Sequence, residues 1–338
     1  MTPDELRRAR CVAQGLTGAE TTPAAAVRRL LAVQAQDLRA ARLALRARCP
    51  ELTIGEIDAA FADGSLVVSW LMRGTLHLVH RDDHAALHAL TTPAVVARNQ
   101  RRLGQEGVPP ADADRAVAII EQAVADTPLS RDELARRVAA AGVRSEGQAM
   151  PHLLMLASLR GRIVMTVHDG RPAYVRNTLP VKDELALTEL VRRYLRGHAP
   201  ATVADIAAWS GLGVRDVRAA VQTLEPELRR DGDLLDRPGR DSVPDQVPVR
   251  LLPAFDPYLL GWRDRGFAVP DSQLRCVHPG GGMLRAVATV DGAAVGTWTL
   301  RRGPRPVVRI EPFGPLPARA RAALDREADD VVRFESST

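Results

Sequence analysis

The spacing of hydrophobic residues is helical over the first two-thirds of the chain, up to about Leu224. It predicts short helices over residues 3–16, 23–33 and 38–48, the last with Asp37 as its N-cap. A further helix is predicted in TIGEIDAAFADG. Two extended runs, SLVVSWL and TLHLVH, follow it, with Arg73 and Gly74 at the turn between them. Helices followed by a β-hairpin are typical of a winged helix.

This order of helices and hairpin repeats along the chain. Ser130 and Glu133 in SRDELARRVAAAG form a capping box, a second helix is predicted over residues 147–159, and IVMTVHDGRPAYV is a hairpin that turns at Asp169 and Gly170. A third unit starts with ATVADIAAWSGLGVRDVRAAVQTL, in which a turn at 211–213 precedes the predicted recognition helix. One such spacing arises by chance in helical proteins, whereas three copies favour tandem winged units.

From about Asp231 the composition changes to Pro, Gly, Asp and alternating β-formers. VRLLPAF, MLRAVATV, AAVGTWTL and PVVRIEPF are predicted strands, with Asp291 and Gly292 at a tight turn, and PARARAALDREADDVVRFE is a closing helix. The fold class is therefore predicted as α+β: tandem winged helix-turn-helix units with a small β-rich C-terminal domain. The predicted boundaries are 1–108, 109–180 and 181–245 for the winged units and 246–338 for the β-rich domain.

Composition and charge point to a polyanionic partner. The 338-residue chain carries 46 Lys+Arg against 41 Asp+Glu, and Lys182 is its one lysine. The planar fork of arginine suits phosphate, although a GC-rich genome would give the same bias. Three widely spaced cysteines predict free thiols, and no apolar run approaches the roughly 20 residues of a membrane span. MTPDELRRAR is predicted as an amphipathic helix rather than a signal peptide, so we expect a soluble cytoplasmic protein.

The segment VQAQD, from Val33 to Asp37, carries the strongest candidate chemistry. Gln34 and Gln36 would point about 200° apart in one continuous helix, whereas in an extended segment they share a face. Because Asp37 is predicted to cap the next helix, both amides can face one cavity at a helix junction. On spacing alone, two glutamines near a helix end are usually solvated polar residues.

Several segments together resemble a known family. VQAQD, RGTLHLV from Arg73, LLPAFDPYLLGWRDR from Leu251 and MLRAVATVDGAAVGTW from Met283 occur in the order and at the spacing of the AlkZ/YcaQ-like winged-helix DNA glycosylases. The resemblance extends over nearly the whole chain. It implies a C-shaped DNA-binding channel and excision of N7-alkylated purines or unhooking of interstrand crosslinks. Some members protect antibiotic producers from their own DNA-alkylating product.

By that resemblance, Gln34 and Gln36 fall on the catalytic Gln-x-Gln motif of the family; another branch has Gln-x-Asp, which this chain lacks. N7 alkylation gives guanine a positive charge and makes it a good leaving group. Two amide carbonyl oxygens could hold the attacking water and stabilise oxocarbenium-like charge at C1′. Asp37 is an alternative general base, although capping is the role its position favours. We expect no metal and no cofactor.

Further residues are expected at the DNA surface. Arg73 and His77 could contact phosphate or the lesion strand, or make a structural hydrogen bond inside the first wing. Tyr258 and Trp262, with Asp256 beside them, could line the channel, or could be core residues. The full set expected to contact DNA is Asp37, Arg39, Arg73, His77, Tyr258, Trp262 and Arg263.

Three histidines are spaced four apart, His80, His84 and His88. They could bind a metal, although a solvated histidine face is the interpretation that the absence of nearby cysteine favours. The hairpins at Asp169 and Asp291 are both candidates for entering a DNA groove.

We therefore expect a monomeric, monofunctional, nucleoid-associated DNA glycosylase that acts on double-stranded DNA carrying alkylated guanine or adenine. The scarcity of lysine fits a mechanism without a Schiff base. One rival is a winged-helix transcription factor that binds DNA without releasing a base. A second is a protein-interaction scaffold, which would show no salt-dependent DNA affinity.

Overall fold

The computed structural model describes residues 1–179, 186–239, 242–303 and 305–337. Lys182 therefore lies outside the described residues. The chain forms two compact units. Unit 1 combines Met1–Ile57 with Ala186–Thr338, and unit 2 is Asp58–Leu185. In the described residues no helix is both long and apolar enough to cross a membrane.

Unit 1 begins with three capped helices and a short extended segment. They are α1 (Pro3–Ala13), α2 (Pro23–Leu30), β1 (Val33–Gln34) and α3 (Leu38–Arg46). Thr2 and Glu5 form a capping box on α1, and Thr22 caps α2. The predicted helix over residues 23–33 ends at Leu30, three residues early, because Leu31 adopts a positive φ of 65° that breaks the helix.

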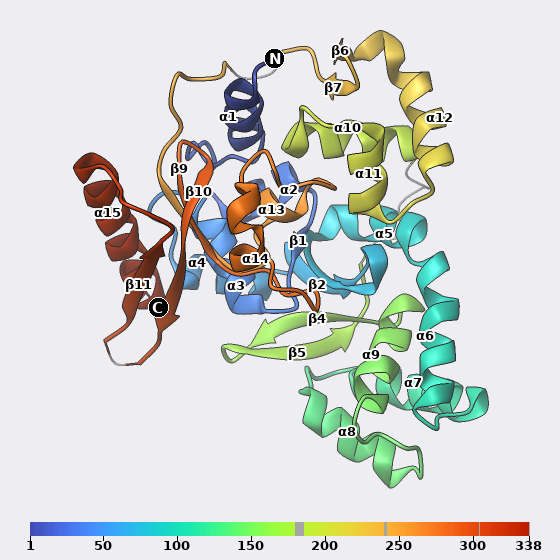
Figure 1. Cartoon of the computed structure of the whole chain (residues 1–338). Coiled ribbons are helices and arrows are strands. Elements are labelled where there is room, and N and C mark those ends of the chain that lie inside the picture. Colours follow the sequence, from blue (N-terminus) through green and yellow to red (C-terminus); the bar gives the residue numbers. More distant parts are fainter. Residues whose placement is uncertain (180–185, 240–241, 304, 338) are drawn as a thin grey trace. The chain divides into compact units, whose positions relative to one another are not determined.

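Unit 2 contains two helix–hairpin modules that share one sheet (Figure 1). α4 (Ile54–Ala62) leads into β2 (Leu66–Trp70), the 3₁₀ turn η1 (Met72–Gly74) and β3 (Leu76–His80), followed by α5 (Arg81–Thr91) and α6 (Pro93–Gln105). The second module is α7 (Pro110–Ala123), α8 (Arg131–Ala140), α9 (Ala149–Leu159), β4 (Ile163–His168) and β5 (Arg171–Arg176). The strand order within the unit is β3-β2-β4-β5.

The helix α9, which precedes the second hairpin, is largely buried within unit 2. Nine of its residues, from Ala149 to Leu159, are buried. The Ser130–Glu133 capping box at the start of α8 is present as predicted. Just before it, Leu129 forms an isolated antiparallel bridge with Tyr174 of β5. α9 therefore forms part of the core of unit 2.

A third helix–hairpin module lies in unit 1. It consists of α10 (Leu187–His198), α11 (Val203–Ser210), α12 (Val214–Leu224), η2 (Glu225–Glu227), β6 (Arg229–Asp231) and β7 (Leu234–Asp236). Gly211 ends α11 with a positive φ of 75°, which glycine adopts without strain. The predicted helix-turn-helix is therefore present, and a short hairpin that the sequence did not indicate follows it.

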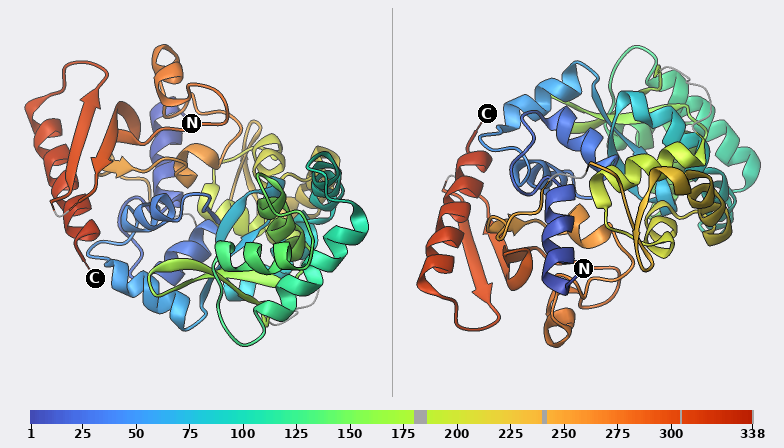
Figure 2. Two further views of the ribbon diagram at one scale, coloured as in Figure 1. Left: turned by 90° about the horizontal axis from the view of Figure 1, so that it is seen from below. Right: turned by 90° about the horizontal axis from the view of Figure 1, so that it is seen from above.

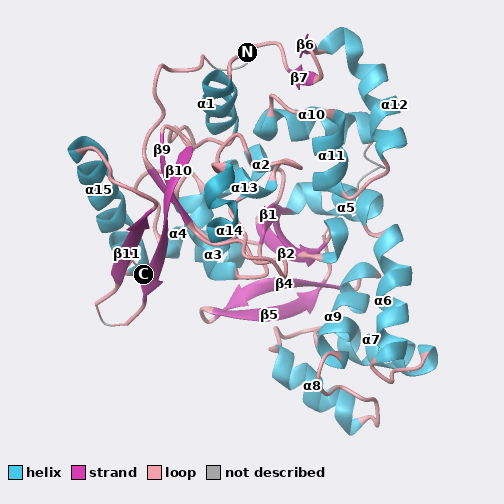
Figure 3. Cartoon of the chain, in the orientation of Figure 1, coloured by secondary structure: helices cyan, strands magenta, loops and turns pink. Residues whose placement is uncertain are grey.

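The C-terminal part of unit 1 is an antiparallel sheet with a helix against it (Figure 3). Its strands are β8 (Arg250–Leu252), β9 (Val287–Val290), β10 (Ala293–Arg301) and β11 (Val307–Pro312), in the order β11-β10-β9-β8. Between β8 and β9 lie α13 (Pro257–Leu260), η3 (Asp271–Gln273) and α14 (Leu274–Val277). The closing helix α15 (Ala318–Glu335) packs against β8 and β11 (Figure 2). All four predicted strands and the closing helix are confirmed.

Candidate active site

The two glutamine amides meet at a break between helices. After α2 ends, the chain is extended through β1 until Asp37 caps α3. In this stretch the Gln34 Nε2 atom donates a hydrogen bond to Gln36 Oε1 at 2.7 Å. Gln34 is half-buried and Gln36 is exposed. The structure thus brings the predicted pair together on one face.

The paired amides keep hydrogen-bonding capacity for a ligand. A carbonyl oxygen has two lone pairs, so Gln36 Oε1 can accept a second hydrogen bond. Gln34 Oε1 and Gln36 Nε2 make no hydrogen bond with any residue that the structure describes. The pair therefore offers two carbonyl oxygens whose relative position is fixed by the bond between the side chains.

Asp37 is occupied by its capping role. Its Oδ1 atom accepts the backbone N–H groups of Arg39 at 2.9 Å and Ala40 at 3.2 Å. The side chain is exposed, and Oδ2 makes no hydrogen bond within the described part of the chain. Asp37 consequently fixes the start of α3 immediately after the amide pair.

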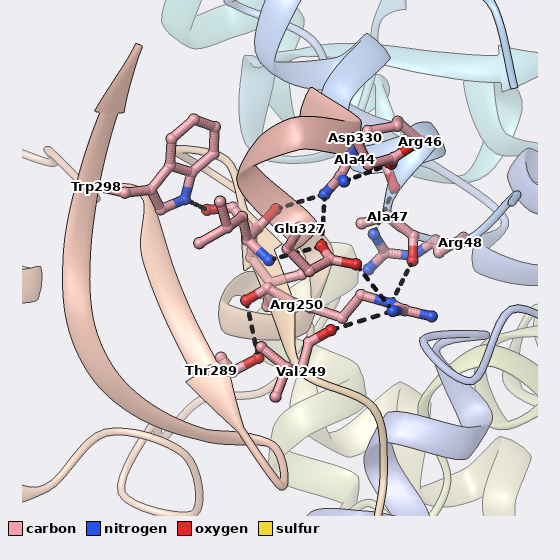
Figure 4. Close-up of polar contacts among 12 residues, drawn as sticks. Ala44, Arg46, Ala47, Arg48, Val249, Arg250, Thr289, Trp298, Glu327 and Asp330 are labelled. Carbon is pink, nitrogen blue, oxygen red and sulfur yellow. Dashed lines mark hydrogen bonds and ion pairs between the residues drawn. The ribbon is translucent and has the colours of Figure 1, made fainter. Parts of the chain in front are cut away.

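The far end of α3 is held by a cluster of ion pairs (Figure 4). Arg46 is almost fully buried, and its guanidinium contacts Asp330 at 2.8 Å and Glu327 at 3.1 Å, both on α15. Glu327 also pairs with Arg250 at 3.0 Å, and Arg250 Nε donates to the Ala47 carbonyl at 3.1 Å. Burial and the nearby Arg46 lower the pKa of Arg250, although Glu327 opposes the shift. These contacts tie α3, β8 and α15 into one body.

A second, fully buried pair lies just after α3. The two Arg48 terminal nitrogens donate to the two carboxylate oxygens of Asp256 at 3.0 and 2.8 Å. Arg48 also donates to Gln14 Oε1 at 2.8 Å, and Gln14 Nε2 donates to the Gly197 carbonyl at 2.7 Å. Sequence reasoning missed the pair, although Asp256 inside the apolar run LLPAFDPYLL was its available signal.

The expectation that Tyr258 and Trp262 line a DNA channel is wrong. Tyr258 is 0% and Trp262 3% exposed, in a cluster with Phe267. The Tyr258 hydroxyl donates to the Gly292 carbonyl at 3.0 Å, and Trp262 Nε1 donates to the His198 carbonyl at 3.1 Å. Both rings have their polar atoms satisfied inside the core of unit 1, so neither presents a group to DNA.

The two candidate residues of the first hairpin, Arg73 and His77, differ in burial. Arg73 is half-buried at the turn with a positive φ of 58°, and its carbonyl accepts a hydrogen bond from Arg98. His77 is 3% exposed with Nδ1 2.9 Å from the Thr75 carbonyl, and burial lowers its pKa to about 3. A neutral, buried imidazole offers no charge to phosphate, so the structural alternative fits His77.

The remaining arginines expected at the DNA surface are both exposed. Arg39 lies in the first turn of α3, three residues after Gln36, and Arg263 follows the buried Trp262. The Arg263 backbone N–H donates to Asp205 Oδ1 at 2.9 Å, which fixes the backbone from which its side chain projects.

The histidine series is not a solvated face. His80 is 7% and His84 2% exposed, and His80 Nδ1 accepts the Asp82 backbone N–H at 3.2 Å as the N-cap of α5. The Nε2 atom of His88 lies 3.0 Å from the carbonyl oxygen of Ser158. Burial and the neighbouring His88 lower the pKa of His84 to about 4. The series therefore packs inside unit 2, because β3 and α5 turn these positions inward.

The two hairpins considered for groove insertion differ in how tightly the rest of the protein holds their turns. Asp291 accepts bonds from Arg8 Nε at 2.9 Å and from the Val247 N–H at 3.0 Å, so its turn is fastened to unit 1. By contrast, the turn residues Asp169 and Gly170 are exposed, and a Cβ built on Gly170 would meet no atom within 4 Å. The second hairpin is thus the one with a free tip.

Comparison with known proteins defines the class of enzyme. The family model described as "DNA glycosylase AlkZ-like" matches residues 27–334. The chain therefore belongs to this family of DNA glycosylases, hydrolases that act on N-glycosyl bonds. The resemblance deduced from the motifs is confirmed, and membership of an enzyme family outweighs the transcription-factor and scaffold alternatives.

A protein sequence and a solved structure, both from Streptomyces sahachiroi, are similar to this chain along nearly their whole length. The chain is 28% identical over 353 residues to an interstrand DNA cross-link repair glycosylase, covering 93% of this chain and 91% of that protein. The solved structure of Streptomyces sahachiroi DNA glycosylase AlkZ has a TM-score of 0.79 at 21% identity, covering 100% of this chain and 97% of that one. This second likeness shows a shared fold of mixed helix and sheet.

Proposed function

We propose that this protein is a monofunctional glycosylase that hydrolyses the N-glycosidic bond of N7-alkylated purines in double-stranded DNA. The observation that carries the proposal is the Gln34–Gln36 amide pair, held at 2.7 Å on an accessible break between helices. The substrate class extends to bulky adducts and interstrand crosslinks, because the 28% identical relative is named for crosslink repair. Repair of general damage and self-resistance of an antibiotic producer are the two roles this chemistry serves.

The charge of the substrate explains why neutral amides suffice. An N7-alkylguanine carries a positive charge, so the electron pair of the breaking C1′–N9 bond returns to the ring and neutralises it. No acid is needed to protonate the leaving base. The water oxygen bonds to C1′, and its proton passes to solvent. A carboxylate in place of Gln36 would also be repelled by nearby phosphates.

The amide pair acts by position. Gln34 Oε1 and the second lone pair of Gln36 Oε1 accept the two hydrogens of one water, leaving its own lone pair directed at C1′. The carbonyl dipoles also stabilise the positive charge that develops on the sugar. Because the side chains already bind one another and Asp37 fixes the start of α3, little reorganisation accompanies the reaction.

The rest of the protein holds the duplex. The three helix–hairpin modules serve as winged helices around a C-shaped channel, Arg39, Arg73 and Arg263 contact phosphates, and the free tip of the second hairpin enters the minor groove. A bulky N7 adduct projects into the major groove, so a monomer approaching from the other side excises it without full base flipping. No cofactor and no covalent amine intermediate takes part.

The proposal is tested by incubating the protein with duplexes that contain N7-methylguanine, a bulky N7 adduct or an N7-linked interstrand crosslink. Released base and abasic sites are quantified for wild type and Gln34→Ala/Gln36→Ala, and borohydride is added to trap any Schiff base. We expect base release by wild type, loss of release in the variant and no trapped complex. Equal release by both proteins, or release of none of the three adducts, would overturn the proposal.

A further inference from the structure

The helix α10 packs directly against the end of α2, within unit 1. The closest approach is at Gly197, which is buried. A Cβ atom built on Gly197 would lie 2.3 Å from the carbonyl oxygen of Arg29 and 3.2 Å from the Cα atom of Leu30. Both are backbone atoms, which cannot rotate away as the end of a side chain can. Residue 197 must therefore be glycine for α10 to lie this close to α2.

The carbonyl that Gly197 contacts is the one that α2 would need in order to continue. In a longer helix, the N–H of Val33 would donate to the oxygen of residue 29. Instead, the backbone of α10 lies against that oxygen, and α2 ends at Leu30. The next residue, Leu31, adopts a φ of 65° and a ψ of −40°, although its side chain is buried. Residues with a Cβ rarely adopt a positive φ, and such strain persists only where the surrounding structure imposes it.

Buried hydrogen bonds hold Gly197 in this place. Its carbonyl oxygen accepts a hydrogen bond from Gln14 Nε2 at 2.7 Å, and Gln14 is the C-cap residue of α1. Gln14 Oε1 accepts from Arg48 at 2.8 Å, and Arg48 is paired with Asp256. The side chains of this series are fully buried. Moving α10 away from α2 would therefore break a hydrogen bond whose groups have no access to water.

We infer that Gly197 and Leu31 are positioning residues for the glutamine amide pair. By lying against the Arg29 carbonyl, Gly197 ends α2. Leu31, anchored by its buried side chain, then turns the chain into the extended segment in which both amides share a face. If α2 continued through this segment, the two amides would point about 200° apart and the bond between them would be lost. The inference rests on the proposed function for its effect on the reaction rate, but not for its effect on structure.

The effect on structure is tested by NMR on the full-length protein labelled with ¹⁵N-glutamine. The side-chain amide resonance of Gln34 is assigned by its loss in Gln34→Ala. In Gly197→Ala the added methyl group displaces α10 or the end of α2, so this resonance should shift as the hydrogen bond to Gln36 is lost. Gly296→Ala is the matched control, because its Cβ would lie 2.6 Å from another backbone oxygen of unit 1, that of Glu311 on β11. The control should leave the Gln34 resonance in place.

The effect on the reaction is measured as the single-turnover rate of N7-methylguanine release with enzyme in excess, together with the Kd for the same duplex. A misplacement of about 1 Å can slow a reaction about 100-fold, so Gly197→Ala should lower the rate at least about tenfold and keep Kd within about twofold. Gly296→Ala should preserve both. Added to Gln34→Ala/Gln36→Ala, Gly197→Ala should not lower the residual rate further, because it acts through the amides.

A Gln34 resonance in Gly197→Ala that stays where it is in Gly296→Ala would overturn the inference. An unchanged release rate, or an equal fall in rate when the amides are already removed, would overturn it too. If Gly197→Ala does not fold, Leu31→Gly decides, because glycine adopts a φ of 65° without strain and loses only the buried anchor. A shifted resonance and a slower rate support the inference, whereas no change in either overturns it.

Failure of the proposed function gives a different result. If the amides have no catalytic role, wild type and Gln34→Ala/Gln36→Ala release base at the same rate. The NMR comparison of Gly197→Ala with Gly296→Ala then decides the inference alone, because it reports the hydrogen bond between the amides whether or not base is released.

Discussion

Replacing Asp256 by asparagine should strongly destabilise unit 1. The substitution removes one negative charge at a site where both Arg48 and Asp256 are 0% exposed at the side chain. Arg48 would keep its neutral acceptors, the Ala44 carbonyl at 2.7 Å and Gln14 Oε1 at 2.8 Å. Its charge, however, would be left buried without a counterion.

The size of the effect follows from the burial. Removing one partner of a buried ion pair costs about 3–5 kcal/mol, because the remaining charge is uncompensated. Unit 1 comprises 57 and 153 residues, 210 in all. For a body of that size each kcal/mol lowers the melting temperature by roughly 2–4 °C, so the expected fall is roughly 6–20 °C.

The assay is thermal unfolding followed by circular dichroism, with Asp4→Asn as the matched control. Asp4 makes the same kind of pair with Arg7 at 2.8 Å, but its side chain is 64% exposed. Exposed pairs contribute about 0–1 kcal/mol, so the control should melt within roughly 4 °C of wild type. Arg48→Met/Asp256→Leu removes both charges and should recover much of the loss. A melting temperature for Asp256→Asn no lower than that of the control would refute the reasoning.

Three further predictions concern His198, Gly74 and Tyr258. Burial lowers the pKa of the His198 imidazole from 6.5 to about 3, so the unfolded state binds a proton at a higher pH than the folded state does. The free energy of unfolding therefore falls as the pH drops below about 6.5, by about 2 kcal/mol at pH 5. In urea unfolding, His198→Gln should lack this loss of about 2 kcal/mol between pH 6.5 and pH 5. Gly74→Ala should destabilise unit 2 by about 2–3 kcal/mol, since its Cβ would lie 2.9 Å from Val95 Cγ1 at a φ of +80°; Gly170→Ala, with φ +69° and open space, should cost about half that in the same melt. Tyr258→Phe should lower stability by about 1–3 kcal/mol through the orphaned Gly292 carbonyl and leave DNA affinity unchanged; a loss of affinity with intact stability would restore a DNA-contact role.

Local signals in the sequence were sufficient for most elements. Capping residues placed α3 and α8 correctly, and the turn pairs at Asp169 and Asp291 located two hairpins. The Gln34–Gln36 pair was predicted because an extended segment places residues two apart on one face, and the cap at Asp37 required such a segment.

Burial and long-range pairing were not accessible in the same way. Arg48 and Asp256 are 208 residues apart, and no local pattern indicates that they meet. The sequence left two roles open for Tyr258 and Trp262, lining the channel or packing in the core, and their burial decides for the core. Composition likewise gives every arginine the same weight, whereas the structure separates Arg46, held by two acids, from Arg81 and Arg176, which have no ion pair in the described residues.

The central claim is that Gln34 and Gln36 together position one attacking water. The most direct measurement is the single-turnover rate of N7-methylguanine release by wild type, Gln34→Ala, Gln36→Ala and the double variant, with enzyme in excess. If the pair works as a unit, each single variant is about 100-fold slower or more, and the double variant is no slower than the slower single variant. Rates within a few-fold of wild type in all three variants, on protein that still binds the duplex, would contradict the claim.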